Sequence, residues 1–249
     1  MTNLLSKETD ILIETQSKLK KTNEELEQFA YAASHDMREP LRMITNYMQM
    51  VQRKLHGKID DKINQYLHFA ADGGLRMQKI IDDILTYTKI NRDESAHENI
   101  DISNLLIEVN KNLEVLIKQH RAKIEYGSLP ILKGNKNQLL RLFQNLIENS
   151  IKFRKKENPN IKIIAQKNNN NWLFSIRDNG IGMNKEYLDS IFLVFKRINR
   201  KSEYPGSGIG LSQCKKIVES HDGNIWVESE PEKGSTFFFT IPLKNEISN

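Results

Sequence analysis

The chain is poor in cysteine and lacks long apolar runs, and each shortage excludes a class of protein. A single cysteine, Cys214, rules out a disulfide framework and a cysteine-based zinc site. No stretch reaches the ~18 consecutive apolar residues of a membrane-spanning helix. The N-terminal MTNLLSKETD lacks the basic-then-apolar layout of a secretory signal. These absences predict a cytoplasmic protein with no membrane segment in this chain.

The composition that remains is an ordinary globular balance. The 249 residues suggest two domains, because a domain takes roughly 150 residues. With 38% hydrophobic and 28% charged residues, the chain is too apolar to be disordered. The net charge of +5 is modest, and no block of Lys and Arg alternates with aromatic residues. No nucleic-acid partner is therefore predicted.

The first part of the chain is predicted to be helical, with a coiled-coil repeat. Leucine recurs every seven residues, at Leu5, Leu12, Leu19 and Leu26. The partner positions of this repeat are mainly polar: Thr9, Gln16, Asn23 and Ala30. We expect a dimeric coiled-coil signalling helix over residues 1–24. A single amphipathic helix packed on its own domain is the alternative.

A helical hairpin is predicted over residues 25–92. The apolar seam slips by one residue at Pro40, which cannot donate to the carbonyl four residues back and bends the helix. Gly57 and the aspartates at 60–61 mark a stop and a start, and a second apolar stripe runs over 63–84. Two such hairpins would bury both stripes as a dimeric four-helix bundle.

Extending the repeat places His35 and Asp36 outside the apolar seam, on the solvent side of the helix. An exposed His-Asp pair one turn before a helix-bending proline is a stronger candidate for chemistry than a lone exposed histidine. Spacing alone leaves open that the pair is an ordinary solvated face.

The rest of the chain predicts an α+β domain over residues 99–245, after a polar linker at 93–98. The expected order is a helix near 102–120, strands at 123–126 and near Ile131, a helix at 137–153, strands at 161–165 and 172–176, and two closing strands in NIWVESEPEKGSTFFFTIPL. Strands gathered on one side with helices between them favour a two-layer α/β sandwich. The predicted fold class is therefore multi-domain, α followed by α+β.

Three groups of residues in this domain have the chemistry of a nucleotide site. Asn145, Asn149 and Lys152 fall on one helix face, where amide oxygens suit Mg²⁺ and a lysine neutralises phosphate. Asp178 ends a strand and has the acceptor for an adenine amino group. Glycines that permit close backbone approach or open a helix toward an anion are Gly180, Gly182, Gly206, Gly208 and Gly210. Taken singly, a polar helix face, a tight turn and a glycine-rich loop explain each group without a ligand.

In this order the pieces resemble the sensor histidine kinases of two-component signalling. The phosphoacceptor box is matched by SHDMREPLR, the N box by QNLIENSIKF, the first glycine box by DNGIGM, the F box by IFLVFKR and the second glycine box by GSGIGLSQCKKIVE. The match runs from Glu24 to Leu243. It implies a dimerisation and histidine-phosphotransfer domain followed by an ATP-binding domain with the Bergerat fold.

The resemblance also implies a role for each matched residue. His35 is expected to attack the γ-phosphate of ATP, with Asp36 polarising its imidazole. Asn149 is expected to hold Mg²⁺, Lys152 to meet phosphate and Asp178 to bind the adenine amino group. The other implied ATP-binding residues are Asn145, Phe153, Gly180, Gly182, Gly206, Gly208, Gly210 and Thr236. The implied partners are a second copy of the chain, the receiver domain of a response regulator, whose aspartate takes the phosphoryl group, and an upstream sensor domain or protein.

Several positions depart from related patterns or leave alternatives open. Related ATPases resemble one another in a glutamate four residues before the Mg²⁺ asparagine, and Asn145 stands there in this chain. The ATP site then lacks its own base, so we expect slow hydrolysis. Glu39 stands where the family often has Thr or Asn, so phosphatase activity does not follow from the resemblance. Arg197 and the basic pair at 200–201 either clamp phosphate or belong to a solvated loop. The alternative function is an ATP-binding dimeric signalling scaffold without phosphotransfer.

Overall fold

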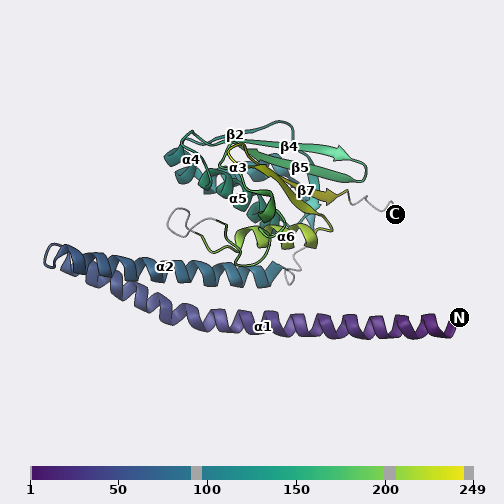
Figure 1. Cartoon of the computed structure of the whole chain (residues 1–249), viewed down its shortest axis with the longest axis horizontal. Coiled ribbons are helices and arrows are strands. Elements are labelled where there is room, and N and C mark those ends of the chain that lie inside the picture. Colours follow the sequence, from purple (N-terminus) through teal and green to yellow (C-terminus); the bar gives the residue numbers. More distant parts are fainter. Residues whose placement is uncertain (1, 91–96, 199–205, 244–249) are drawn as a thin grey trace. The chain divides into compact units, whose positions relative to one another are not determined.

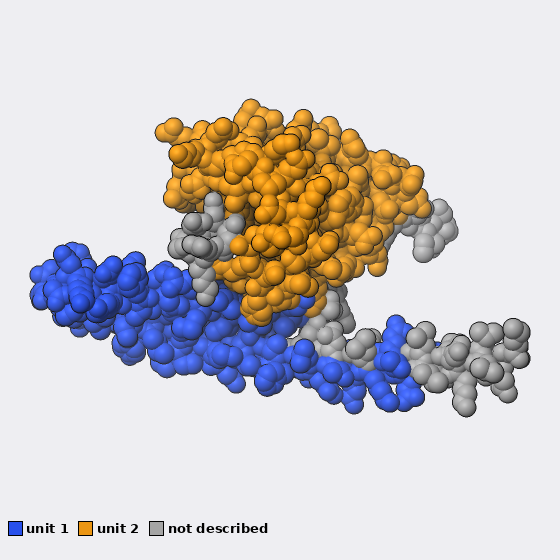
Figure 2. Space-filling model, viewed as in Figure 1, with its two compact units in different colours: residues 1–89 blue, residues 90–249 orange. Residues whose placement is uncertain are grey.

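The computed structural model describes residues 2–90, 97–198 and 206–243. The chain divides into two compact units, Met1–Lys89 and Ile90–Asn249, which Figure 2 colours separately. Among the residues described, no helix combines the length and apolar content needed to cross a membrane.

Unit 1 is a helical hairpin, as predicted. Helix α1 spans Thr2–Leu55 and helix α2 spans Asp61–Lys89. Gly57 adopts a left-handed φ of 74° in the turn between them, a conformation open to glycine because it has no Cβ. The side chain of Asp60 accepts a hydrogen bond from the backbone N–H of Ile63 at 2.7 Å, so it caps the start of α2.

Helix α1 continues through Pro40 without interruption. Figure 1 shows that its axis bends in the C-terminal half of the helix, the half that contains Pro40. A proline ring pushes against the carbonyl one turn back and removes one backbone hydrogen bond, which explains a bend without a break. The side chains of Leu5, Leu12 and Leu19 lie outside the described residues, so the coiled-coil register stays a prediction.

The two helices of unit 1 approach closely where small residues face each other. A Cβ atom on Gly74 of α2 would lie 2.3 Å from the Thr45 hydroxyl oxygen on α1. Thr45 is buried, and its hydroxyl donates to the carbonyl of Leu41 at 2.8 Å. Leu41 packs with Ile81 and Leu85 in the small core of the hairpin. The side chains at this crossing therefore set the distance between α1 and α2.

A single hairpin leaves a second apolar face uncovered. The large apolar side chains that remain exposed on α1 and α2 include Phe29, Met37, Met43, Ile44, Tyr47, Met50, Ile63, Tyr66, Phe69 and Met77. They recur on both helices at spacings of three and four residues, which places them along helical stripes. Exposed apolar surface of this extent is typical of a protein–protein contact.

Unit 2 contains a five-stranded sheet in the order β2-β4-β5-β7-β6. Its strands are β2 (Lys123–Tyr126), β4 (Asn160–Asn168), β5 (Asn171–Asp178), β6 (Ile225–Glu230) and β7 (Gly234–Pro242). Strands β2 and β4 are parallel, and the other neighbours are antiparallel. A separate antiparallel pair joins β1 (Glu98–Asp101) to β3 (Ile131–Gly134).

Helices cover one side of this sheet (Figure 1). They are α3 (Ile102–Asn112), α4 (Glu114–His120), α5 (Lys136–Lys152) and α6 (Gly210–Ser220), with a short 3₁₀ helix at Lys185–Tyr187. Phe174 and Phe239 stack at 4.8 Å between ring centroids, and Phe143 of α5 meets Phe174 edge-on at 5.8 Å. Helix and sheet thus share one core, which confirms the predicted two-layer α/β sandwich.

Two local predictions differ from the structure. The helix expected near 102–120 is two helices, α3 and α4, with Leu113 between them in a non-helical conformation. Strand β1 was not predicted, and its first residue, Glu98, falls within the predicted linker. Its four residues carry no apolar alternation, and they become a strand by pairing with β3, a segment distant in sequence. Pairing of this kind is set by tertiary structure, which local periodicity does not reveal.

Candidate functional site

His35 and Asp36 lie on α1 with their side chains 64% and 83% exposed. The Nδ1 atom of His35 is 3.2 Å from Oδ1 of Asp36. The preceding residue, Ser34, is buried, so the helix turns its packed side away from the pair. The exposed position predicted for both residues is confirmed. An ionised carboxylate accepts only, so Nδ1 donates the hydrogen bond and Nε2 carries the free lone pair.

Charged side chains surround the His35–Asp36 pair on the hairpin. The Nε and Nη2 atoms of Arg38 donate to Oδ1 of Asp82 at 3.1 and 2.6 Å, which ties α1 to α2. Glu39 accepts a hydrogen bond from Arg42 at 2.9 Å. Exposed ion pairs of this kind contribute little to stability, so their main effect is to hold the side chains near His35 in place.

In unit 2, Asp178 ends strand β5 as a buried carboxylate. Its Oδ1 atom accepts hydrogen bonds from the backbone N–H groups of Gly180 and Ser235 at 2.8 and 3.1 Å. Oδ2 accepts from the Ser150 hydroxyl at 3.5 Å. Burial raises the pKa of Asp178 above its ordinary value, and these hydrogen bonds oppose the rise. The result is a fixed hydrogen-bond acceptor in a sheltered place.

The loop after Asp178 is pressed against neighbouring backbone at both of its glycines. A Cβ atom on Gly180 would lie 2.5 Å from the carbonyl oxygen of Phe153, at the end of α5. A Cβ atom on Gly182 would lie 1.9 Å from the carbonyl oxygen of Glu230, and Gly182 has a φ of 67°. Between them, Ile181 donates its backbone N–H to Phe153 at 2.9 Å. No other residue type fits this path, which holds Asp178 next to the end of α5.

The outward face of α5 carries the three polar residues predicted there. The Nδ2 atom of Asn145 donates to the carbonyl of Gly210 at 3.3 Å, which joins α5 to the start of α6. Asn149 follows one turn later and is partly buried. The Lys152 ammonium lies 4.6 Å above the ring of Phe153 and 2.7 Å from where a Cβ atom of Gly206 would be. The N-box helix and the second glycine box therefore meet along this face.

Residues of the F box contact the second glycine box and hold it in place. Gly208 has a φ of 77°, and a Cβ atom there would lie 3.0 Å from the backbone of Phe195. The Nη1 atom of Arg197 donates to the carbonyl of Gly206 at 2.6 Å. Gly210 is the first residue of α6, so the N–H groups of the first turn of the helix open at this point. The basic pair predicted at 200–201 lies outside the described residues.

The structure brings Ser235, rather than Thr236, to Asp178. Residues 235, 237 and 239 of β7 are buried with the helices, and alternation places Thr236 on the other face of the sheet. Ser235 supplies the backbone N–H to Asp178, and its hydroxyl is 2.9 Å from that of Ser229. Ser235 was missed, although the alternation of the strand in sequence contained the signal.

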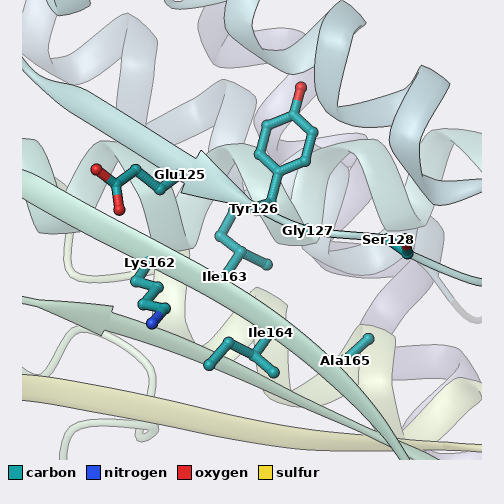
Figure 3. A pocket seen from close by; sticks show the side chains of 8 residues that line it. All are labelled: Glu125, Tyr126, Gly127, Ser128, Lys162, Ile163, Ile164 and Ala165. Atoms are coloured by element: carbon teal, nitrogen blue, oxygen red, sulfur yellow. The ribbon is translucent and has the colours of Figure 1, made fainter.

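A shallow hollow of about 460 Å³ lies elsewhere on unit 2, where β2 ends beside β4. Figure 3 shows Tyr126 and Ile163 directed to one side of these strands and Lys162 and Ile164 to the other. Alternating strand side chains line the hollow, and the predicted site residues do not contribute to it. The nucleotide-type groups gather instead around the end of α5 and the start of α6.

The donor set of this region fits a magnesium nucleotide. A buried carboxylate acceptor is available for an amino group, a lysine for phosphate, and the amide oxygens of Asn145 and Asn149 for a hard cation. Glycines line the path where a ligand would need close backbone approach. Fold and site together define a class, a phosphoacceptor hairpin joined to an ATP-binding sandwich.

Comparison with known families agrees with this class. Residues 25–93 match the model of the His Kinase A (phospho-acceptor) domain. Residues 134–245 match the model of the histidine kinase-, DNA gyrase B- and HSP90-like ATPase. The chain belongs to the histidine kinases, with a phosphoacceptor domain followed by an ATP-binding domain.

Named relatives include phytochromes as well as histidine kinases. The chain is 42% identical over 241 residues to cyanobacterial phytochrome A of Nostoc sp., covering 97% of this chain and 32% of the relative. It is 33% identical to the signal transduction histidine-protein kinase ArlS of Staphylococcus epidermidis, covering 96% of this chain and 54% of that protein. The chain thus spans about a third of the phytochrome's length and about half of the kinase's.

Solved structures share the fold. Full-length ShkA in complex with AMPPNP has a TM-score of 0.67 at 20% identity, covering 86% of this chain and 45% of that one. The Acinetobacter baumannii histidine kinase AdeS has a TM-score of 0.59 at 20% identity, covering 85% of this chain and 98% of that one. At this identity the likeness concerns the fold alone.

Proposed function

We propose that this chain is the kinase portion of a two-component sensor, which phosphorylates His35 with ATP and passes the phosphoryl group to an aspartate of a receiver domain. The observation that carries the proposal is the exposed His35–Asp36 pair, at 3.2 Å, in a chain that also has the ATP-binding sandwich. An exposed nucleophile is required because the phosphate donor is bound by a separate unit. The receiver domain must reach the same atom afterwards.

The phosphoryl transfer follows from the hydrogen bond at His35. Asp36 accepts a hydrogen bond from the Nδ1–H group of His35, which leaves the Nε2 lone pair available to attack phosphorus. The Nε2–P bond forms while the bond from the γ-phosphorus to the bridging oxygen of ATP breaks and ADP leaves. Asp36 stabilises the positive charge that the imidazole acquires. In the second reaction the N–P bond breaks and the receiver carboxylate becomes an acyl phosphate.

In unit 2, the proposed roles are those of binding and positioning. Asp178 accepts from the adenine amino group, Lys152 neutralises phosphate, and Phe153 lies beside the base. Asn149, with Asn145 on the same helix face, is proposed to hold Mg²⁺, which neutralises charge on the phosphates when bound. The glycines of both boxes allow the backbone to approach. Thr236 stays a prediction from sequence, whereas the geometry favours Ser235.

The absence of a carboxylate at position 145 supports transfer to histidine over hydrolysis. The α5 side chains proposed to bind the nucleotide, Asn145, Asn149 and Lys152, are amides and a lysine, and none of them accepts a proton from water at neutral pH. Glu148, the carboxylate next to Asn149 on α5, is not among the proposed binding residues. A base is supplied with the acceptor instead, by Asp36 on unit 1. We therefore propose slow ATP hydrolysis when His35 is not in reach.

The proposed assembly is a homodimer that receives its signal from a sensor. The exposed apolar stripes of α1 and α2 supply the surface for a four-helix bundle of two hairpins. The proposed domains are a signalling coiled coil at 1–24, the phosphoacceptor domain at 25–92, a linker at 93–98 and the ATP-binding domain at 99–245. Since the chain spans only part of its relatives, we propose that the sensor is a further domain or a separate protein in the same cytoplasmic pathway.

The proposal is tested by incubating the protein with γ-labelled ATP and Mg²⁺. Wild type is expected to take an acid-labile, alkali-stable label, and His35→Gln is expected to lose it. The matched control is His68→Gln, another exposed histidine of the hairpin, which should be labelled like wild type. Wild type that binds ATP without taking label would overturn the kinase proposal in favour of an ATP-binding scaffold.

A further inference from the structure

Helix α6 carries a buried amide among residues that otherwise suit a hydrophobic core. Gln213 is 1% exposed, and the neighbouring buried positions of α6 include Cys214, Ile217 and Val218. A buried amide without hydrogen bonds destabilises a fold, because the amide gives up its hydrogen bonds to water without replacing them. The hydrogen-bond partners of Gln213 therefore explain why an amide is buried in α6.

The partners of Gln213 lie on the N-box helix. Its Oε1 atom accepts from Nε of Arg141 at 3.1 Å and from Nδ2 of Asn145 at 3.3 Å. Arginine Nε is a donor only, so it determines which end of the glutamine amide faces α5. Asn145 is one helical turn after Arg141, and Gln213 therefore spans both positions from α6.

A backbone carbonyl, which can accept but not donate a hydrogen bond, also orients Asn145. The carbonyl of Gly210, an acceptor only, takes a hydrogen bond from Nδ2 of Asn145 at 3.3 Å. With Gly210 and Gln213 both accepting from Nδ2, the amide cannot rotate by half a turn without placing oxygen against oxygen. The Oδ1 atom is thereby kept at the opposite end of the amide from the hydrogen bonds to the Gly210 carbonyl and to Oε1 of Gln213.

We propose that Gln213, fixed by Arg141, is a positioning residue that holds the Asn145 amide with its oxygen, rather than its NH₂ group, presented to the magnesium nucleotide. The inference rests on the proposed function of the α5 face. Gln213 is not one of the ATP-binding residues that the family resemblance implies. A cation is attracted by an amide oxygen and repelled by an NH₂ group. Loss of the clamp should therefore weaken binding of the nucleotide with Mg²⁺ more than binding of the nucleotide alone.

The first experiment measures binding of AMPPNP to the full chain by calorimetry, with Mg²⁺ and with EDTA. Gln213→Met keeps the length of the side chain and removes its acceptor. It is expected to weaken binding roughly three- to ten-fold in Mg²⁺, the effect of one lost hydrogen bond, and less than about two-fold in EDTA. Gln213→Glu retains an acceptor for Arg141 and should restore most of the affinity. Lys215→Ala, at an exposed position of α6, is the control.

A double-mutant cycle separates positioning from a structural effect. If Gln213 acts through Asn145, adding Gln213→Met to Asn145→Ala should change Mg²⁺–AMPPNP affinity less than about two-fold. Additive losses in the double variant, equal losses with and without Mg²⁺, or no loss in folded Gln213→Met would each overturn the inference. Because the readout is binding, the inference is tested even if wild type takes no label, the result that would overturn the kinase proposal itself.

Discussion

Asp178 illustrates how one residue serves both folding and recognition. Its carboxylate accepts two backbone hydrogen bonds that bring β5, the first glycine box and β7 together. Burial nevertheless raises its pKa, so the ionised form is less favourable in the folded chain than in the unfolded one. Natural proteins often retain such an unfavourable group where a ligand needs it.

Asp178→Asn should stabilise the protein and weaken nucleotide binding. The Asn oxygen can accept both backbone hydrogen bonds without a buried charge, so we expect a gain of ~1 kcal/mol, or about 2–4 °C in Tm, at pH 8. Because the folded pKa of Asp178 is raised, wild type loses stability as pH rises through that pKa. The Tm difference should therefore shrink as pH falls toward the ordinary value of 3.8.

The same variant should bind adenine nucleotides at least roughly ten-fold more weakly, because an NH₂ group then faces the amino group of the base. Thermal melts across pH and nucleotide titrations measure the two effects. A variant with wild-type affinity would contradict the role of Asp178. A Tm difference that grows in acid would contradict the direction of its pKa.

Cys214 should be chemically inert in the folded protein. Burial raises its pKa to about 12, so thiolate is nearly absent at neutral pH. A thiol-specific reagent at pH 8 is expected to label the native chain slowly and the denatured chain at once. Cys214→Ser, which leaves no thiol, supplies the blank. Rapid labelling of the native chain would show that α6 opens from the core far more often than its packing implies.

At the scale of elements, α2 has two adjacent glycines, Gly73 and Gly74, and only Gly74 lies against α1. A Cβ atom on Gly73 would meet only the flexible end of Arg76, at 3.9 Å, whereas one on Gly74 would lie 2.3 Å from the Thr45 hydroxyl oxygen. The contrast arises because successive helix residues point in directions about 100° apart. Only one of the two glycines is needed for the helix crossing.

Gly74→Ala should destabilise the hairpin by about 1–3 kcal/mol, since the added methyl group forces α1 and α2 apart. Gly73→Ala should instead stabilise it by up to ~1 kcal/mol, because alanine is the better helix former. Chemical denaturation followed by circular dichroism distinguishes the two signs. Equal effects for both variants would mean that the close approach at Thr45 is not required.

Element packing also explains how the glycine boxes work. The start of α6 is linked to α5 through Asn145, and the preceding loop is linked to the F box through Arg197. The first contact joins residues 65 positions apart and the second residues nine positions apart, and together they connect the three boxes in one edge of the sandwich. Substitutions in one box should therefore affect the geometry of the others, and their effects on nucleotide binding should not add.

At the scale of the whole molecule, the two units differ in how much apolar surface they bury within one chain. Unit 2 buries its aromatic core within one chain, while among the described residues of unit 1 the buried apolar cluster is Leu41, Ile81 and Leu85, and apolar side chains are exposed along both helices. A hairpin with so small a core is marginal alone. Two copies would cover the exposed stripes, which is why self-association is expected at unit 1.

Phe69→Glu should convert the proposed dimer to a monomer of 29.0 kDa, because a carboxylate would be buried in the proposed bundle without a partner. Phe69 is 57% exposed in the single chain. The control is Ile107→Glu on unit 2, where Ile107 is 60% exposed and the dimer should persist. Light scattering after size exclusion measures the mass. A Phe69→Glu variant that stays dimeric would remove α2 from the proposed interface.

Much of the architecture follows from local patterns. The hairpin turn, the exposed position of His35 and Asp36, the strand pair β4 and β5, and α5 were all predicted, because helical and strand periods are written into consecutive residues. The break at Leu113, strand β1 and the position of Ser235 were not. Strand β1 depends on a neighbour that is distant in the sequence, β3, and the hydrogen bond of Ser235 depends on Asp178, although the alternation of β7 already indicated which of its residues are buried.

The sequence by itself determined the two-part organisation, the residue types of the site and the family, because these depend on composition, period and the order of short motifs. Only the tertiary structure decided which atoms meet. It buried the Asp178 carboxylate, placed Gly74 against Thr45, and brought the Asn145 amide into a hydrogen bond with Gln213. Hydrogen bonds and steric contacts act over a few ångströms in space, and residues that are 68 positions apart, such as Asn145 and Gln213, become neighbours only when the chain has folded.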